Sequence, residues 1–262
     1  MLQAPQRTTL SGPALVRLLA RLADVEVPES RQSLSDRLSQ WLGWTDAIAL
    51  SSALNGSPPA VAAGARVFGS AEEADCVRLR SSLTKAVVGD SVFAIARRNG
   101  RAPMQRQTHA QVQSAVDAPV DYAVFRQRYQ AIQQSMERGI ANLRGRLRGM
   151  LAAKTPAMAR LAVVDAVMER ALGERERNLL GAVPGMLAGH FERLREAELQ
   201  ALAAAVADSD ATEAPEASED AAPITPGAWL DVFRKDMQSV LLAELEVRFQ
   251  PVEGLLAALR TR

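Results

Sequence analysis

The chain of 262 residues carries 31 basic and 30 acidic side chains, one cysteine and two histidines. This length is enough to bury a sizeable core, and a composition of 48% hydrophobic and 23% charged residues excludes an intrinsically disordered protein. The single Cys76 excludes an intramolecular disulfide framework, and 47 alanines beside 4% aromatic residues favour helices over strands.

Targeting and membrane signals are weak in this sequence. Arginines interrupt the apolar N-terminal stretch, which argues against a signal peptide. The longest uncharged run, residues 47–65, contains Pro58 and Pro59, which mark a turn and not a membrane span. We therefore expect no membrane insertion and a cytoplasmic location, with a peripheral position at the inner membrane as an alternative.

Residues 1–98 are expected to form an N-terminal helical bundle. Segments that begin at Ser11, Ser30 and Ser70 each start with a residue that can cap a helix, and each carries apolar side chains at helical spacing. The helix from Ser70 is expected to run to about Arg97. These elements point to an all-α protein.

The clearest element is a long helix predicted from Asp121 to Lys154. Its apolar residues recur at gaps of three and four, which is the spacing of a coiled-coil seam. They are Tyr122, Phe125, Tyr129, Ile132, Met136, Ile140, Leu143, Leu147 and Met150. Thr155–Pro156 then begins a second helical segment after a short connection. We expect residues 120–207 to form a long antiparallel coiled-coil-like helical hairpin, joined to the N-terminal bundle by an irregular connector at 99–119.

The second arm of the hairpin is expected to divide near Gly181 and Pro184. Residues 208–223 hold six acids, no base and two prolines, so we expect a disordered acidic linker. Residues 224–262 are predicted to form a C-terminal amphipathic helix, which Pro251 interrupts before a short tail helix. A candidate partner-binding face of this helix comprises Trp229, Phe233, Met237, Val240 and Leu241. The linker would let the helix either reach a partner or dock back on its own hairpin, and both possibilities stay open.

Three tryptophans lie near the ends of predicted helices. Large aromatic side chains can fill a core or anchor a partner at an interface. We expect Trp41 in the core. Both interpretations stay open for Trp44 and Trp229.

The balanced total charge conceals an uneven distribution. Residues 1–207 carry a net charge of +7 and residues 208–262 a net charge of −6. The candidate anion-binding or nucleic-acid-binding residues are Arg97, Arg98, Arg101 and Arg106 in the connector and Arg144, Arg146 and Arg148 in the long helix. Such clusters can bind phosphates by releasing counterions. The neutral total charge and the few aromatic residues between these arginines favour solvated faces instead. A third interpretation is a basic surface that the acidic linker masks.

No pattern of catalytic or ligand-binding residues stands out. His109 and His190 have no second histidine or cysteine at metal-ligand spacing, so no metal site is predicted. Cys76 lies on an apolar helix face and is interpreted as a small core residue. Asp165 and Glu169 share a helix face with arginines nearby, which is typical of an ion network. We expect no enzymatic activity and no cofactor.

A family resemblance is carried by the N-terminal string LSGPALVRLLARLADVEVPESRQSLSDRLSQWLGWTDAIALSSAL and the later stretch VDYAVFRQRYQAIQQSMERGIANLRGRLR. Both resemble an uncharacterised bacterial family, Domain of Unknown Function thirty-three forty-eight, over nearly the whole chain. The family has no assigned activity, so the resemblance implies no catalytic residue. It does imply a setting, since such genes tend to lie beside genes for a proton-channel-like membrane protein and an outer-membrane-protein-A-like protein.

Together these features predict a non-enzymatic helical interaction or adaptor protein. The gene setting implies an accessory subunit of an envelope-associated complex. The expected partners are other proteins, either a subunit of that membrane complex or a second copy of this chain. The alternative is a nucleic-acid-binding protein that uses the arginine-rich helix and connector.

Overall fold

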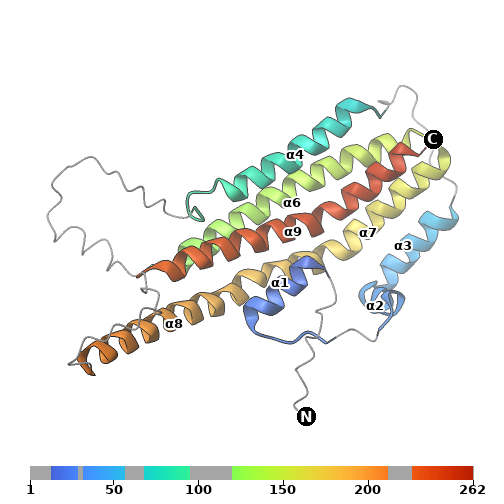
Figure 1. Cartoon of the computed structure of the whole chain (residues 1–262). Helices are drawn as coiled ribbons and strands as arrows, with labels where there is room; N and C mark the ends of the chain where they lie inside the picture. Colours follow the sequence, from blue (N-terminus) through green and yellow to red (C-terminus); the bar gives the residue numbers. More distant parts are fainter. Residues whose placement is uncertain (1–12, 29–31, 57–67, 95–119, 212–225, 262) are drawn as a thin grey trace, which may run out of the picture.

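The computed structural model describes residues 13–28, 32–56, 68–94, 120–211 and 226–261. Within these ranges every regular element is an α-helix, so the predicted all-α class is confirmed (Figure 1). The helices are α1 (Ala14–Ala23), α2 (Leu34–Trp41), α3 (Trp44–Asn55), α4 (Ser70–Val88), α6 (Tyr122–Ala152), α7 (Pro156–Gly181), α8 (Val183–Ala211) and α9 (Ala228–Arg260).

Helices α6 and α7 form the predicted antiparallel hairpin and pack along each other (Figure 1). The Thr155 hydroxyl caps α7 by accepting a hydrogen bond from the Met158 amide at 3.2 Å, and Pro156 fits the first helical position because its missing N–H would have no partner there. The expected seam of α6 is largely buried, from Phe125 to Leu147. Superhelical winding of the hairpin stays a prediction.

The second arm divides where the sequence predicted, because α7 ends at Gly181 and α8 begins at Val183. Pro184 has no N–H to offer the Leu180 carbonyl, which lies four residues earlier. That carbonyl instead accepts a hydrogen bond from Gln133 Nε2 of α6 at 2.9 Å. At the division between α7 and α8, the second arm is therefore hydrogen-bonded to the buried Gln133 side chain of α6.

Helix α9 lies at the centre of the core and packs on α6, α8, α4 and α1 (Figure 1). The interruption predicted at Pro251 is wrong, since α9 runs without a break to Arg260. A proline inside a helix costs about 3 kcal/mol, and burial of the following turns opposes that cost. Val252 is 0% exposed and Leu255 is 3% exposed.

The described helices of residues 1–98 do not form the separate bundle that the sequence predicted. Instead, α1 packs on α8 and α9, α3 packs on α7, and α4 packs on α6 and α9. Leu22 of α1 and Leu83 of α4 join the same apolar core as α6 and α9. Each of these helices has only a narrow apolar stripe, and the long helices provide the larger surface on which to bury it.

Two expected boundaries also differ. Helix α4 ends at Val88 and not near Arg97, because Gly89 caps it and the Asp90 side chain then accepts a hydrogen bond from the Val92 amide at 3.0 Å. Helix α8 continues to Ala211, so residues 208–211 of the expected linker are helical. The remainder of that linker and the connector at 99–119 lie outside the described residues.

Candidate functional site

A buried carboxylate, Glu244, lies where α6 meets α9, and its side chain is 0% exposed. Its Oε2 accepts a hydrogen bond from the Tyr129 hydroxyl at 2.9 Å, and Gln133 Nε2 lies 3.0 and 3.1 Å from the two carboxylate oxygens. Arg248 Nε donates to Oε1 at 2.8 Å. A buried charge is tolerated when it is paired and fully hydrogen-bonded, and these four side chains meet that condition.

Helical spacing brings the four side chains of this buried polar cluster together. Tyr129 and Gln133 are one turn apart on α6, and Glu244 and Arg248 are one turn apart on α9. The pattern of the sequence predicts Tyr129 only as part of the apolar seam and does not predict the cluster. The available signal was a pair of opposite charges, four residues apart, inside the apolar stripe that Leu241 and its neighbours form.

The acid–base properties of the cluster indicate a structural role. Burial raises the pKa of Tyr129 well above the usual tyrosine value, and the neighbouring Glu244 carboxylate acts in the same direction. Burial likewise raises the pKa of Tyr122 to about 12. Both phenols therefore keep their protons at neutral pH and serve as hydrogen-bond donors, not as bases.

A pocket of about 590 Å³ adjoins this cluster between α6, α7 and α9, and Trp41 of α2 also lines it. Arg248 and Leu180 belong to the pocket wall, and they also contact the buried cluster through Glu244 and Gln133. The wall combines an apolar part with several charged groups. Its charged residues are Arg144, Arg148, Arg175, Arg177, Arg248, Glu137, Glu169 and Glu176.

The arginines of α6 that the sequence nominated for anion binding are engaged in ion pairs. Arg144 makes a bidentate contact with Asp165 of α7, at 2.9 Å from Nε and 2.6 Å from Nη2. Arg148 pairs with Asp165 at 3.1 Å and with Glu169. Arg146 pairs with Asp75 of α4 at 3.2 Å.

These arginines therefore do not form the free anion-binding patch that was predicted on α6. The physical reason is the hairpin turn, which places the acidic residues of α7 opposite Arg144 and Arg148. The ion network expected around Asp165 and Glu169 is present. The other nominated arginines lie outside the described residues, as does His109; they are Arg97, Arg98, Arg101 and Arg106.

The candidate partner-binding face of the C-terminal helix is in the core of its own chain. Phe233, Met237, Val240 and Leu241 are each 0% exposed. Trp229 is half-buried and meets the Phe191 ring edge-on, with 4.9 Å between ring centroids. Of the two possibilities for this helix, the structure has it docked on its own chain, because this stripe is the one that α9 buries against α6 and α8.

The remaining tryptophans occupy two different environments. Trp41 is half-buried and not in the core as expected, and the Arg175 guanidinium stacks over its ring at 4.6 Å from the centroid. Trp44 is 83% exposed at the start of α3. Ile48, one helical turn later, is 51% exposed, so two large apolar side chains lie next to each other on the surface of α3.

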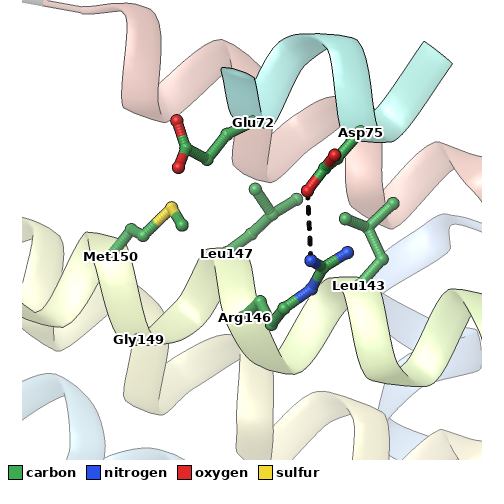
Figure 2. A pocket seen from close by; sticks show the side chains of 7 residues that line it. All are labelled: Glu72, Asp75, Leu143, Arg146, Leu147, Gly149 and Met150. Atoms are coloured by element: carbon green, nitrogen blue, oxygen red, sulfur yellow. Dashed lines mark hydrogen bonds and ion pairs between the residues drawn. The ribbon is translucent and has the colours of Figure 1, made fainter. Parts of the chain in front are cut away.

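A second pocket, of about 320 Å³, lies between α4 and α6 (Figure 2). Figure 2 shows Glu72 and Asp75 of α4 facing Arg146 and Met150 of α6. Asp75 is paired with Arg146, and Glu72 accepts a hydrogen bond from the Gly69 amide at 3.0 Å, which caps α4. Both carboxylates thus have structural partners.

Three further features bear on chemistry. Cys76 is only 4% exposed, and burial raises the pKa of its thiol, in agreement with its interpretation as a core residue. His190 Nε2 lies 2.8 Å from Asp236 Oδ2, and the described residues contain no group of three potential metal ligands. Within the same ranges, no helix combines the length and the apolar character that crossing a membrane requires.

The fold and its sites thus define an all-α protein with a charged cluster in its core and an arginine-lined pocket beside it. The chain belongs to the family described as Protein of unknown function (DUF3348), which it matches over residues 1–261. The family resemblance seen in the sequence is confirmed. Comparison with curated proteins and with solved structures found no match.

Proposed function

We propose that this protein is a non-enzymatic adaptor that binds a protein partner through the exposed face of α3. The observation that carries the proposal is the exposure of Trp44, at 83%, together with Ile48, at 51%, one helical turn later. Side chains four residues apart on a helix lie on the same face. Tryptophan is enriched among the residues that dominate the binding energy of interfaces.

The opposite side of α3 attaches the helix to the rest of the protein. Ala49, Leu50 and Ala53 are half-buried at helical spacing, and α3 packs on α7. Trp44 and Ile48 therefore project away from that contact. Anchored on one face and apolar on the other, α3 is suited to present a binding surface without refolding.

The partner is best described as an uncharged, apolar segment of another protein. The exposed residues from Trp44 to Asn55 carry no charged side chain; besides Trp44 and Ile48 they are Thr45, Ala47, Ser51, Ser52, Leu54 and Asn55. An interface core depleted of charge favours apolar contacts. With the gene setting of the family, this surface supports an accessory subunit of an envelope-associated complex, located in the cytoplasm at the inner membrane.

Two observations weigh against other functions. Pairing of Arg144 and Arg148 with acids of α7 leaves the nucleic-acid alternative without its cluster on α6. The carboxylate of Glu244 is enclosed by hydrogen-bond donors and is not available to a substrate. We therefore propose no catalytic role.

Co-purification tests the proposal. The chain would be co-expressed with the neighbouring proton-channel-like membrane protein, and retention of that protein measured for the unaltered chain and for a Trp44→Ser, Ile48→Ser variant. Loss of a hot spot worth about 2 kcal/mol or more predicts about thirtyfold weaker retention. Val77→Ser, at a 68% exposed position of α4, is the matched control.

Because these side chains are exposed, both variants should keep the helicity and the thermal stability of the parent. Retention that survives the Trp44 and Ile48 changes would refute the proposed binding face. Retention lost equally in the Val77 variant would also refute it, because the effect would then not be specific to α3.

A further inference from the structure

The pocket between α6, α7 and α9 has the size and lining of a small-molecule site. Its volume of about 590 Å³ falls within the range of roughly 300–1,000 Å³ that is typical of ligand pockets. Ile140, Leu172, Leu179, Val247 and Pro251 give it an apolar wall. That wall would cover the hydrocarbon or aromatic body of a ligand.

Within the described part of the chain, the charged groups that line the pocket are paired with one exception. Arg144 and Arg148 pair with Asp165 and Glu169. Arg177 pairs with Glu137 at 3.5 Å, and Arg248 pairs with Glu244 and, at 3.4 Å, with Glu176. Each carboxylate that lines the pocket takes part in one of these pairs. Arg175 has no carboxylate within 4.0 Å among the described residues. Among the described residues that line it, the pocket thus offers a single cation without a carboxylate partner.

Arg175 is also held in position. Its guanidinium lies over the Trp41 ring, with Cζ 4.6 Å from the ring centroid. Stacking leaves the N–H edge of a guanidinium free to bind two oxygens of one anionic group. Arg248, which also lines the pocket, is 8% exposed and donates a hydrogen bond to Glu244 at 2.8 Å.

We propose that this pocket binds a small organic monoanion with an apolar body, a carboxylate or sulfonate whose charged group Arg175 holds beside Trp41. Its apolar part lies against Leu172, Leu179 and Val247. This inference does not depend on the proposed function, because it concerns a different surface and needs no protein partner.

A pair of fluorescent probes tests the proposal on the full chain. 1-Anilinonaphthalene-8-sulfonate carries the anionic group, and N-phenyl-1-naphthylamine has the same ring skeleton without it. The sulfonate should bind more tightly than the neutral probe. Replacing Arg175→Gln should weaken sulfonate binding about fivefold, the effect of losing one exposed ion pair of about 1 kcal/mol, and leave the neutral probe unchanged.

A blocking variant places the probe in this pocket. Gly173 lines the pocket, and a Cβ added there meets no atom within 4 Å, so the side chain of Gly173→Leu fits into the empty space. Probe binding should be lost in this variant. Gly185→Leu is the matched control, since an added Cβ there also meets nothing within 4 Å, but Gly185 does not line the pocket.

Both glycine variants should fold, because leucine is the better helix former. Sulfonate binding that persists in Gly173→Leu would place the probe on another surface, such as the exposed Trp44, and overturn the proposal. Equal affinity for the two probes, with no effect of Arg175→Gln, would overturn the choice of an anion.

Discussion

Replacing Arg248 with methionine tests the energetic role of the buried polar cluster. The substitution keeps most of the side-chain volume and removes the guanidinium whose Nε donates to Glu244 at 2.8 Å. Glu244, which is 0% exposed, would then keep hydrogen bonds only from Tyr129 and Gln133. A buried negative charge would then have no positive partner.

The expected loss follows from that burial. Removing one member of a buried ion pair costs about 3–5 kcal/mol, because the other charge is left uncompensated. Small proteins unfold with a total free energy of about 5–15 kcal/mol, so the loss is a large part of the stability. For a chain of this size it corresponds to a fall in Tm of roughly 10 °C.

Urea unfolding followed by circular dichroism measures the change in the free energy of unfolding. Arg78→Met is the matched control, since Arg78 is paired with Asp75 but its side chain is 69% exposed. That variant should lose only about 0.5 kcal/mol. Combining Arg248→Met with Glu244→Gln should recover much of the stability, because the lone charge is then gone.

Two results would refute this reasoning. One is an Arg248→Met variant no less stable than Arg78→Met. The other is a double variant that loses the sum of its two single changes, since the two side chains would then be energetically independent.

Three further outcomes are expected. Burial raises the pKa of Tyr122 from 10.0 to about 12, so between these pH values the folded state keeps a proton that the unfolded state loses. The free energy of unfolding should therefore be highest below pH 10 and fall between pH 10 and 12. A free energy of unfolding that does not change over this range, measured by urea unfolding, would contradict this. Iodoacetamide should label the buried Cys76 far more slowly in the folded protein than in urea, and equal rates would show that the thiol is accessible. Gly139→Leu should lower the free energy of unfolding by about 1–3 kcal/mol, because a Cβ added there lies 3.1 Å from Leu79 Cδ1. Gly149→Leu on the same helix should not lower it, because a Cβ added there meets no atom within 4 Å. Equal stabilities of the two variants in denaturation would contradict the close approach of α4 and α6.

Local rules of the sequence were sufficient for the helices and for the hairpin. The three-and-four spacing from Phe125 to Leu147 is a property of one helix, so it can be read without a partner. Thr155 and Pro156 define the cap and the first turn of α7. Because the connection between α6 and α7 is short, the second helix is expected to pack antiparallel to the first. Pro184 follows a local rule too, since its missing N–H favours a break in the helix at that point, although Pro251 shows that tertiary packing can override the same rule.

The sites depended on which helices meet. An apolar stripe predicts that a face is buried, but not what covers it, and for this reason the stripe of Phe233 and Leu241 left docking on a partner and docking on the same chain both open. A cluster of arginines predicts positive charge, but the acids that neutralise Arg144 belong to another helix. Likewise, Glu244 is a binding partner of Tyr129 only because α9 docks on α6.

The sequence by itself therefore determined an all-helical chain, its long hairpin and the division near Pro184, because these depend on neighbours within a few residues. Only the tertiary structure decided that the C-terminal helix is the core, that the arginines of α6 are paired, and that a pocket adjoins Glu244. Those features rest on contacts between residues far apart in sequence, such as Tyr129 with Glu244, and no local period encodes such contacts.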